Sequence, residues 1–160
     1  MERTAVYTLR PVQDEDEMLL LEIYSSTRAD EMALVPWDEA QKQAFLQMQF
    51  SAQQKHYRAY FPHATHEMIL AEGQPVGRLY IDRRETEIRI LDVTLLPQAR
   101  GHGIGTQILP DIMKEADHRN QSCSIYVESF NRSLGLFQRL GFVKIEESGA
   151  LWLMEWRAGS

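Results

Sequence analysis

The sequence feature that most constrains the fold is a glycine-rich segment in the middle of the chain, Gln98 to Thr106. Its three glycines stand at alternating positions, and a long apolar stretch that stops at Pro97 precedes it. Four apolar residues then recur at helical spacing: Ile104, Ile108, Ile112 and Ala116. A period that changes from extended to helical across a run of glycines predicts a loop between a strand and a helix.

Such a loop is suited to bind an anion. Glycines keep side chains away from the place where the backbone meets a ligand, and the first turn of the following helix has free N–H groups. Together with the positive end of the helix dipole and the charge of Arg100, these groups favour a phosphate or a pyrophosphate. The alternative is a glycine-rich structural turn that precedes a helix and binds no ligand.

A nicotinamide-binding loop is a second alternative. Its usual spacing is G-x-G-x-x-G, whereas this chain has G-x-G-x-G, and Glu128 would then be the residue that holds a ribose. The strand, loop and helix lie in mid-chain after hairpin-like strands, and too few residues remain for a doubly wound sheet. The sequence therefore disfavours a dinucleotide fold.

The strand before the loop, residues 87–96, predicts an irregularity of its own. Ile88 and Ile90 have one parity, and Leu91, Val93 and Leu95 have the other. A regular strand cannot bury both sets on one face, because its side chains alternate with a period of two. We therefore expect a β-bulge between Ile90 and Asp92.

The rest of the pattern predicts one α+β domain over residues 1–160 with a mostly antiparallel sheet. A helix over 38–61 is expected to begin at the N-cap Asp38 and to bury Phe45, Met48 and Ala52, and Pro110 is expected to kink the helix after the loop. The expected strands are 4–10, 67–71, 76–82, 87–96, 122–128, 142–146 and 150–157. The other expected helices begin at residue 14, follow the glycine loop, and span 131–140.

Charge and composition exclude several functions. The net charge is −6, the opposite of what a phosphate-binding nucleic-acid protein carries. No apolar run reaches the ~20 residues of a membrane span, and the first ten residues lack the pattern of a secretory signal. The single cysteine, Cys123, lies in an apolar setting and predicts a buried position in a reducing, cytoplasmic protein. His63 and His66 match no zinc spacing, so we expect two surface histidines and no metal.

The glycine loop resembles the signature of the GNAT superfamily of acyl-CoA N-acyltransferases. In that signature a Gln or Arg is followed by two residues, Gly, one residue and then Gly or Ala, as in Gln98 to Gly103. A second segment, Asn131 with Leu134, Phe137 and Gly141-Phe142, is similar to the family's downstream motif. The order of the predicted elements also matches over nearly the whole chain.

The resemblance implies a sheet of six or seven strands with helices on both faces and two splayed central strands. It also implies acetyl-CoA as the cofactor, with its pantetheine arm on Val93, Thr94 and Leu95 and its pyrophosphate on the amides that start at Gly101. The full set of implied cofactor contacts is Val93, Thr94, Leu95, Gln98, Arg100, Gly101, His102, Gly103, Ile104, Gly105, Thr106, Asn131 and Phe137.

Transfer of an acyl group to an amine needs a proton acceptor, because a lysine-like amine has a pKa near 10.4 and is protonated at neutral pH. It also needs a hydrogen-bond donor to the oxyanion that forms on the carbonyl. Glu87, Asp92 and Glu128 are the candidate bases, although each carboxylate alone has an equally ordinary structural explanation. The N–H of Leu95 is the family-like oxyanion donor. Phe137 stands where the family commonly has a Tyr that protonates the leaving thiolate, and a phenyl ring cannot donate a proton. A Schellman cap ending at Gly141 would pack Phe137 against Phe142.

The predicted function is transfer of an acetyl group to a primary amine of a small molecule, peptide or protein. Because of Phe137, a non-catalytic acyl-CoA-binding sensor is the alternative. The resemblance also makes a homodimer through the C-terminal strands plausible, with Trp152 and Trp156 at the interface or in the core. The identity of the acceptor cannot be predicted from the residues.

Overall fold

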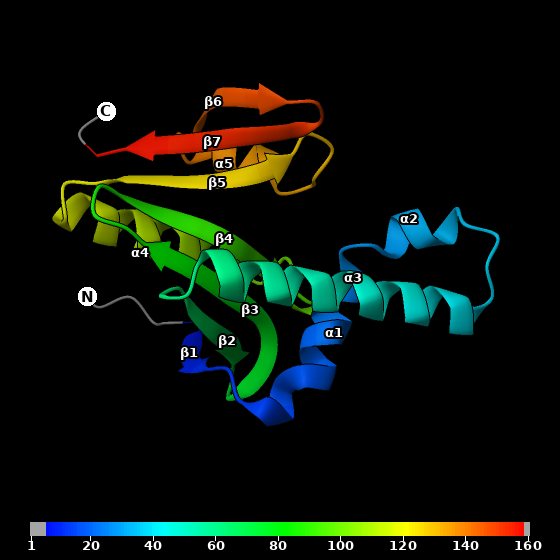
Figure 1. Cartoon of the computed structure of the whole chain (residues 1–160). Coiled ribbons are helices and arrows are strands. Elements are labelled where there is room, and N and C mark those ends of the chain that lie inside the picture. The colour runs from blue at the N-terminus through cyan, green and yellow to red at the C-terminus, as the bar shows by residue number, and fades with distance from the viewer. Residues whose placement is uncertain (1–5, 159–160) are drawn as a thin grey trace.

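The chain is built around one seven-stranded sheet with the strand order β1-β2-β3-β4-β5-β7-β6 (Figure 1). The structure, a computed structural model, describes residues 6–158. The strands are β1 Thr8–Pro11, β2 Thr65–Ala71, β3 Gln74–Arg83, β4 Glu87–Leu95, β5 Ser122–Glu128, β6 Val143–Ser148 and β7 Leu151–Arg157. Only β4 and β5 pair in parallel, which confirms the predicted mostly antiparallel α+β sheet.

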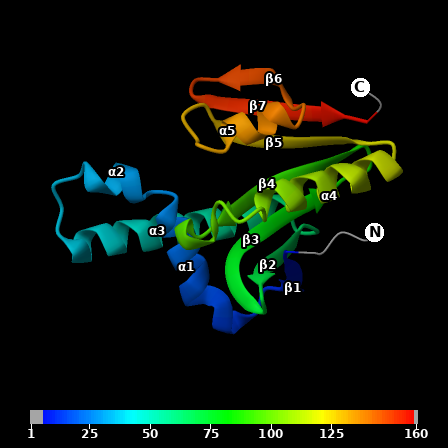
Figure 2. The ribbon, with the colours of Figure 1, turned by 180° about the vertical axis from the view of Figure 1, so that it is seen from behind.

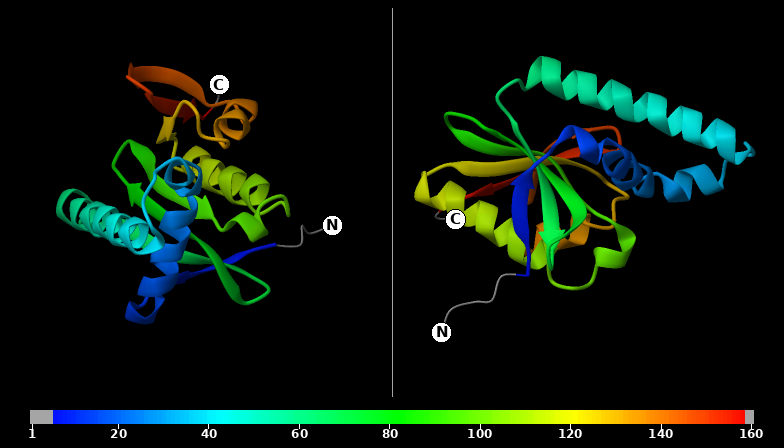
Figure 3. Two further views of the ribbon diagram at one scale, coloured as in Figure 1. Left: turned by 90° about the vertical axis from the view of Figure 1, so that its right-hand side faces the viewer. Right: turned by 90° about the horizontal axis from the view of Figure 1, so that it is seen from below.

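Helices cover both faces of this sheet, as predicted. They are α1 Glu17–Ser26, α2 Ala29–Ala33, α3 Glu39–Tyr60, α4 Gly105–His118 and α5 Leu134–Arg139, with short 3₁₀ turns at Asp14–Asp16 and Pro97–Ala99. α1 and α3 lie on one face and α4 on the other (Figure 3). Each face has its own buried cluster, one around Ile23, Phe50 and Met68 and one around Ile81, Ile108 and Phe142.

The predicted bulge in β4 is confirmed. Tyr80 of β3 pairs with Asp92, while the next residue, Ile81, pairs with Ile90, so Leu91 is the extra residue. The insertion reverses the parity of the strand. Ile88 and Ile90 before it, and Val93 and Leu95 after it, therefore all pack into the core under α4: Ile88 and Ile90 are fully buried, and Val93 and Leu95 are partly buried.

α3 begins where the sequence predicted but buries a different face. Asp38 caps it by accepting a hydrogen bond of 2.8 Å from the N–H of Gln41. Leu46 and Phe50 are its buried residues. Of the predicted face, Phe45 packs partly against the core, whereas Met48 is 60% exposed and Ala52 is exposed, so the prediction was wrong for those two. The helix is rich in glutamine and weakly amphipathic, and its apolar partners on α1 and the sheet decide its orientation. No helix within residues 6–158 is both long and apolar enough to cross a membrane.

The termini and the remaining elements follow the predictions with small shifts. β1 starts at Thr8, and residues 4 and 5 of the predicted strand 4–10 lie outside the described residues. Pro110 lies inside α4, where it removes one backbone donor. Cys123 is buried, as expected, and burial raises the pKa of its thiol to about 12.

The close approach of β3 to β4 gives a first prediction. A Cβ at Gly77 would lie 2.3 Å from the carbonyl oxygen of Thr94, so we expect Gly77→Ala to force the two strands apart and to destabilise the protein by about 2 kcal/mol or more. Gly135→Ala in α5 is the matched control, because its new methyl meets only the flexible end of Arg139 and alanine favours a helix. Denaturant unfolding should show a loss for the first variant and no loss for the second. Equal stability of the two would contradict the strand geometry.

Candidate functional site

Two residues of the glycine loop have a backbone conformation that only glycine adopts readily. Gly101 has φ of 79° and Gly103 has φ of 85°, in the region where a Cβ causes strain. A Cβ built on Gly101 would find no atom within 4 Å, so the loop faces open space there. Thr106 braces the turn by donating its hydroxyl to the carbonyl oxygen of Gly103 at 3.0 Å. The backbone is thus exposed to an incoming group.

The amides of this loop are unused by the protein. Within residues 6–158, no acceptor meets the N–H groups from Gly101 to Thr106, and the first intrahelical bonds are those from Gln107 and Ile108 to the oxygen of Ile104. The loop opens α4, whose dipole adds positive potential at this end. A run of free amides at a helix N-terminus binds phosphate oxygens, so the residues present fit a pyrophosphate.

Two guanidinium groups lie near the loop. Partial burial lowers the pKa of Arg100, and so does repulsion from the neighbouring charge of Arg132. Arg132 also lies 3.9 Å from Asp30, at the start of α2. A polyanion between Arg100 and Arg132 would relieve the repulsion. The sequence analysis missed Arg132, although it directly follows the motif residue Asn131.

β4 and β5 part beside the loop, as the predicted splay requires. They pair only from Glu87–Ser122 to Ile90–Ile125, and both strands then continue unpaired with each other to Leu95 and Glu128. Figure 2 shows the two strands diverging from behind, with α4 crossing in front of them. We call this unpaired stretch the β4–β5 splay. It starts at the bulge residue Leu91.

Two residues of β4 turn their backbone groups into the splay. The N–H of Leu96 bonds to Val76 of β3, and backbone directions alternate along a strand. The backbone groups of Val93 and Leu95 therefore face β5, on the side where the family resemblance implies a pantetheine arm and an oxyanion donor. Thr94 differs from the prediction, because its carbonyl oxygen points at Gly77 of β3 and its hydroxyl donates to Asp92 at 2.7 Å.

A tyrosine of α3 secures the bulge. The hydroxyl of Tyr57 donates to the carbonyl oxygen of Leu91 at 3.1 Å, and its ring lies edge-on to Tyr80 at 4.9 Å. Burial and the nearby charge of Asp92 raise the pKa of Tyr57 to about 12, so the hydroxyl keeps its proton at neutral pH. The bulge oxygen therefore has a permanent donor.

The carboxylate of Asp92 forms an ion pair with a buried arginine. Arg78 is fully buried, its Nε donates to Asp92 Oδ2 at 2.6 Å, and its Nη2 donates to Gln53 of α3 at 2.5 Å. With Thr94 on the other oxygen, both carboxylate oxygens of Asp92 have a partner. This geometry favours a structural role for Asp92 as the counter-charge of Arg78.

The other two candidate carboxylates lie at opposite ends of the pair of strands β4 and β5. Glu128 ends β5 with a 34% exposed side chain, and one of its oxygens lies 3.4 Å from Arg28, beside α2. Glu87 begins β4 and is bound by Arg84 at 3.1 Å and by Arg89 at 3.0 Å. A strand of 9 residues spans roughly 26 Å, so Glu87 is remote from Leu95 and the loop. The structure brings Glu128 and Asp92 to the splay but not Glu87.

The second motif shapes the turn before α5. Asn131 accepts hydrogen bonds from the N–H and the hydroxyl of Ser133 at 2.8 and 2.7 Å. At the other end of α5 the predicted Schellman cap is confirmed: Phe142 N–H bonds to the oxygen of Phe137 at 3.0 Å, and Gly141 has φ of 101°. Phe137 is 1% exposed and packs on Phe142, so in this structure its ring belongs to the core.

His66 does not lie on the surface, which corrects the prediction. It belongs to β2, stacks on Tyr80 at 4.2 Å, and burial lowers the pKa of its imidazole to about 4. Its sequence position between a turn and an apolar run gave no sign of this. Among residues 6–158, no three His, Cys, Asp or Glu side chains are grouped to hold a metal ion.

Comparison with known proteins gives one family and many similar structures. The family described as "Acetyltransferase (GNAT) domain" matches residues 30–150. Comparison with curated protein sequences finds no significant match. The PaiA N-acetyltransferase from Thermoplasma acidophilum, solved with coenzyme A, superposes with a TM-score of 0.71 at 16% identity, over 94% of this chain and 98% of that one.

Two further structures have the same fold. Arabidopsis thaliana Naa50, solved with the bisubstrate analogue CoA-Ac-MVNAL, gives a TM-score of 0.63 at 14% identity, over 95% of this chain and 99% of that one. A GNAT family acetyltransferase from Elizabethkingia anophelis with acetyl-CoA bound gives 0.61 at 15% identity, over 96% and 99%. The predicted fold and its splayed sheet are therefore confirmed.

The ion pair between Arg78 and Asp92 gives the second prediction. Asp92→Ala leaves a buried guanidinium without its carboxylate, and we expect a loss of about 3 kcal/mol or more in the free energy of unfolding. The double variant Arg78→Met with Asp92→Leu removes both charges and should be more stable than the single one. Urea denaturation of both proteins tests this. A fully stable Asp92→Ala protein would show that the carboxylate is not needed for the fold.

Proposed function

Because the chain belongs to the family of GNAT acetyltransferase domains, whose members use acetyl-CoA, we propose that it transfers an acetyl group from acetyl-CoA to a primary amine. The observation that carries the proposal is the conjunction of two features. One is the run of free amides from Gly101 to Thr106, and the other is the β4–β5 splay, which begins at Leu91 on the strand that leads into the loop. Together they offer a site for phosphates and a slot for an extended arm.

The chain's own groups would hold the cofactor as follows. The loop amides and Arg100 receive the pyrophosphate, and Arg132 adds a second cation on the same side. Val93 and Leu95 present backbone groups to the pantetheine arm, in the way that an added strand would pair. Gln98 and His102 are exposed at the mouth of the loop, while Ile104 is buried and anchors the loop to the core.

When bound, acetyl-CoA supplies a thioester whose carbonyl carbon the amine attacks, and the C–S bond breaks to release the thiolate. The N–H of Leu95 points into the splay and donates to the carbonyl oxygen as it gains negative charge. The amine must lose a proton, and Glu128 is the carboxylate best placed to take it. Its Oε2 has no partner within residues 6–158, whereas both oxygens of Asp92 are engaged.

The proton that the leaving thiolate needs cannot come from Phe137. This residue has no hydroxyl and is 1% exposed. A thiol with a pKa near 8.5 leaves tolerably as the thiolate, so water can protonate it afterwards. Phe137 thus changes the source of the proton for the thiolate and leaves the acetyl-CoA site intact.

The acceptor is best sought among cationic amines. The protein as a whole has a net charge of −6, and Asp30, Glu31 and Glu128 lie together beside the splay, where Arg28 and Arg132 also lie. Negative potential raises the local concentration of ammonium compounds. A panel of polyamines, amino-acid amides and lysine-containing peptides therefore comes first in a screen for acetyl-CoA-dependent thiol release. Binding of CoA with no acceptor that raises thiol release would favour the non-catalytic sensor instead.

The glycine loop gives the third prediction. Gly103→Glu places a carboxylate where the phosphates bind and should abolish CoA binding in calorimetry. Gly73→Glu is the control, since Gly73 has a similar φ of 78°, lies in the turn between β2 and β3, and would meet no atom within 4 Å. Both proteins should unfold at similar temperatures. Unchanged CoA affinity in a folded Gly103→Glu protein would refute the loop assignment.

Glu128 gives the fourth prediction. Glu128→Gln should lower kcat by about 100-fold or more and leave CoA affinity unchanged, because a general base acts only in the chemical step. Glu31→Gln is the control: Glu31 also binds Arg28, at 3.0 Å, so this variant loses the same ion-pair partner without losing the base. Steady-state kinetics with the best amine of the panel measures both. Equal losses in the two variants would mean that positioning of Arg28, not proton transfer, is what matters.

A further inference from the structure

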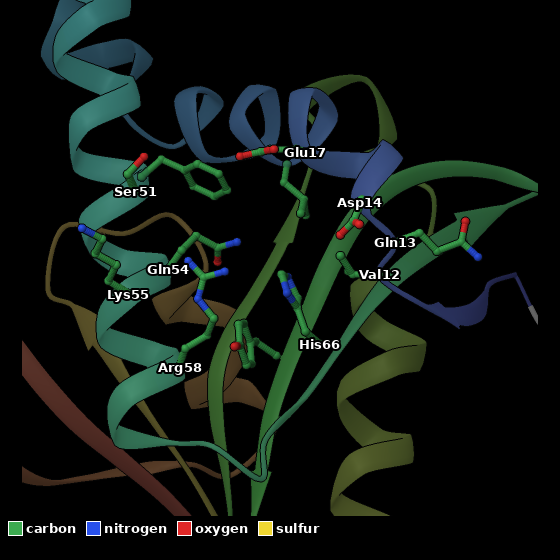
Figure 4. A pocket seen from close by; sticks show the side chains of 12 residues that line it. Val12, Gln13, Asp14, Glu17, Ser51, Gln54, Lys55, Arg58 and His66 are labelled. Carbon is green, nitrogen blue, oxygen red and sulfur yellow. The ribbon is translucent and has the colours of Figure 1, made fainter.

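A hollow of about 360 Å³ lies beside α3, on the face of the sheet that α1 and α3 cover. Pockets for small molecules in proteins are roughly 300–1,000 Å³ in volume. Its floor is formed by His66 of β2 and Tyr80 of β3, and its walls by the start of α1 and by one side of α3. Figure 4 shows the side chains that line it.

The hollow is separated from the β4–β5 splay by α3 itself. Residues Ser51, Gln54 and Arg58 line the hollow, while Gln53 and Tyr57 point towards β3 and β4. At 100° per residue these are neighbouring but different sides of one helix. Tyr57 packs on Tyr80 and bonds Leu91, so its side chain lies between the hollow and the start of the splay. A ligand of this hollow is therefore not the acetyl acceptor.

The rim of the hollow carries opposite charges on opposite walls. Arg58 and Lys55 come from α3, and Asp14 and Glu17 come from the turn that starts α1. Within residues 6–158 none of these four side chains has an ion-pair partner, although the two basic residues and the two acidic residues line the same opening. In Figure 4, Arg58 turns towards the space below Asp14 and Glu17. A ligand with both charges would bridge the walls.

The interior adds unused polar atoms and an apolar surface. The side-chain oxygen of Gln54 and Nε2 of His66 are buried and have no hydrogen-bond partner within the described residues. His66 is neutral at pH 7, so its ring offers one donor and one acceptor. Leu20 and Phe50, both buried, and Val12 supply an apolar wall. Buried polar atoms are normally satisfied, so two unsatisfied atoms beneath one hollow are unusual.

We propose that this hollow is a second ligand site, which binds a free α-amino acid with an apolar side chain as its zwitterion. The carboxylate lies on Arg58, the ammonium group lies between Asp14 and Glu17, and the side chain packs on Phe50 and Leu20. The site needs neither the glycine loop nor the splay, so it does not depend on the acetyltransferase assignment.

Binding is measured by calorimetry and thermal unfolding with L-leucine, L-methionine and L-phenylalanine at millimolar concentration. At least one of them should bind and raise the melting temperature. Leucinamide, which lacks the carboxylate, and N-acetyl-leucine, which lacks the ammonium group, should each bind about tenfold more weakly than leucine, because each loses one charged hydrogen bond. Failure of all three amino acids to bind would overturn the proposal.

Variants locate the site. Arg58→Gln should weaken the binding of leucine about tenfold and leave the binding of leucinamide unchanged. The double variant Asp14→Asn with Glu17→Gln should also weaken the binding of leucine about tenfold, and it should leave the binding of N-acetyl-leucine unchanged. Lys114→Gln, an exposed lysine on α4 across the sheet, is the control and should bind leucine normally. The Gly103→Glu protein should also bind leucine normally. Loss of leucine binding in that protein would place the ligand in the glycine loop and refute the second site.

Discussion

At Leu91, β4 carries one residue more than the strand it pairs with, and the core and the candidate site both follow from that surplus. The extra residue lets Ile88, Ile90, Val93 and Leu95 all pack into one core, although their parities conflict in a regular strand. It also coincides with the point where β4 stops pairing with β5. A bulge bends the strand that carries it and disrupts pairing locally, which fits the parting of β4 from β5 at this point.

The bulge is held by groups that the sequence keeps far apart. Tyr57 of α3 donates to the bulge oxygen, and Asp92 accepts from Arg78 of β3, whose other nitrogen reaches Gln53. The Arg78 guanidinium also lies 5.8 Å from the ring of Phe50. These contacts fasten α3 across β3 and β4. They also separate the splay from the hollow over His66 and Tyr80, for which we propose an amino-acid ligand.

The same contacts divide the work among the carboxylates. A carboxylate that neutralises a buried arginine is needed for folding, and one with a free oxygen at a strand end is available for chemistry. Asp92 answers the first description and Glu128 the second. Phe137, which looked like a defect in the second motif, fills the core against Phe142 and forms the cap of α5. The fold therefore tolerates the missing hydroxyl at that position.

The sequence by itself determined the features that rest on local rules. Glycines at 101 and 103 take positive φ, Asp38 caps α3, Gly141 ends α5, and the clash of parities placed the bulge, because each of these depends on neighbouring residues alone. Only the tertiary structure decided which carboxylate keeps a free oxygen, that His66 is partly buried against Tyr80, and that Arg132 lies near Asp30 of α2. It also decided which face α3 buries, with Phe50 inside and Met48 outside. Those facts depend on partners contributed by distant strands and helices, and no spacing along one segment records them.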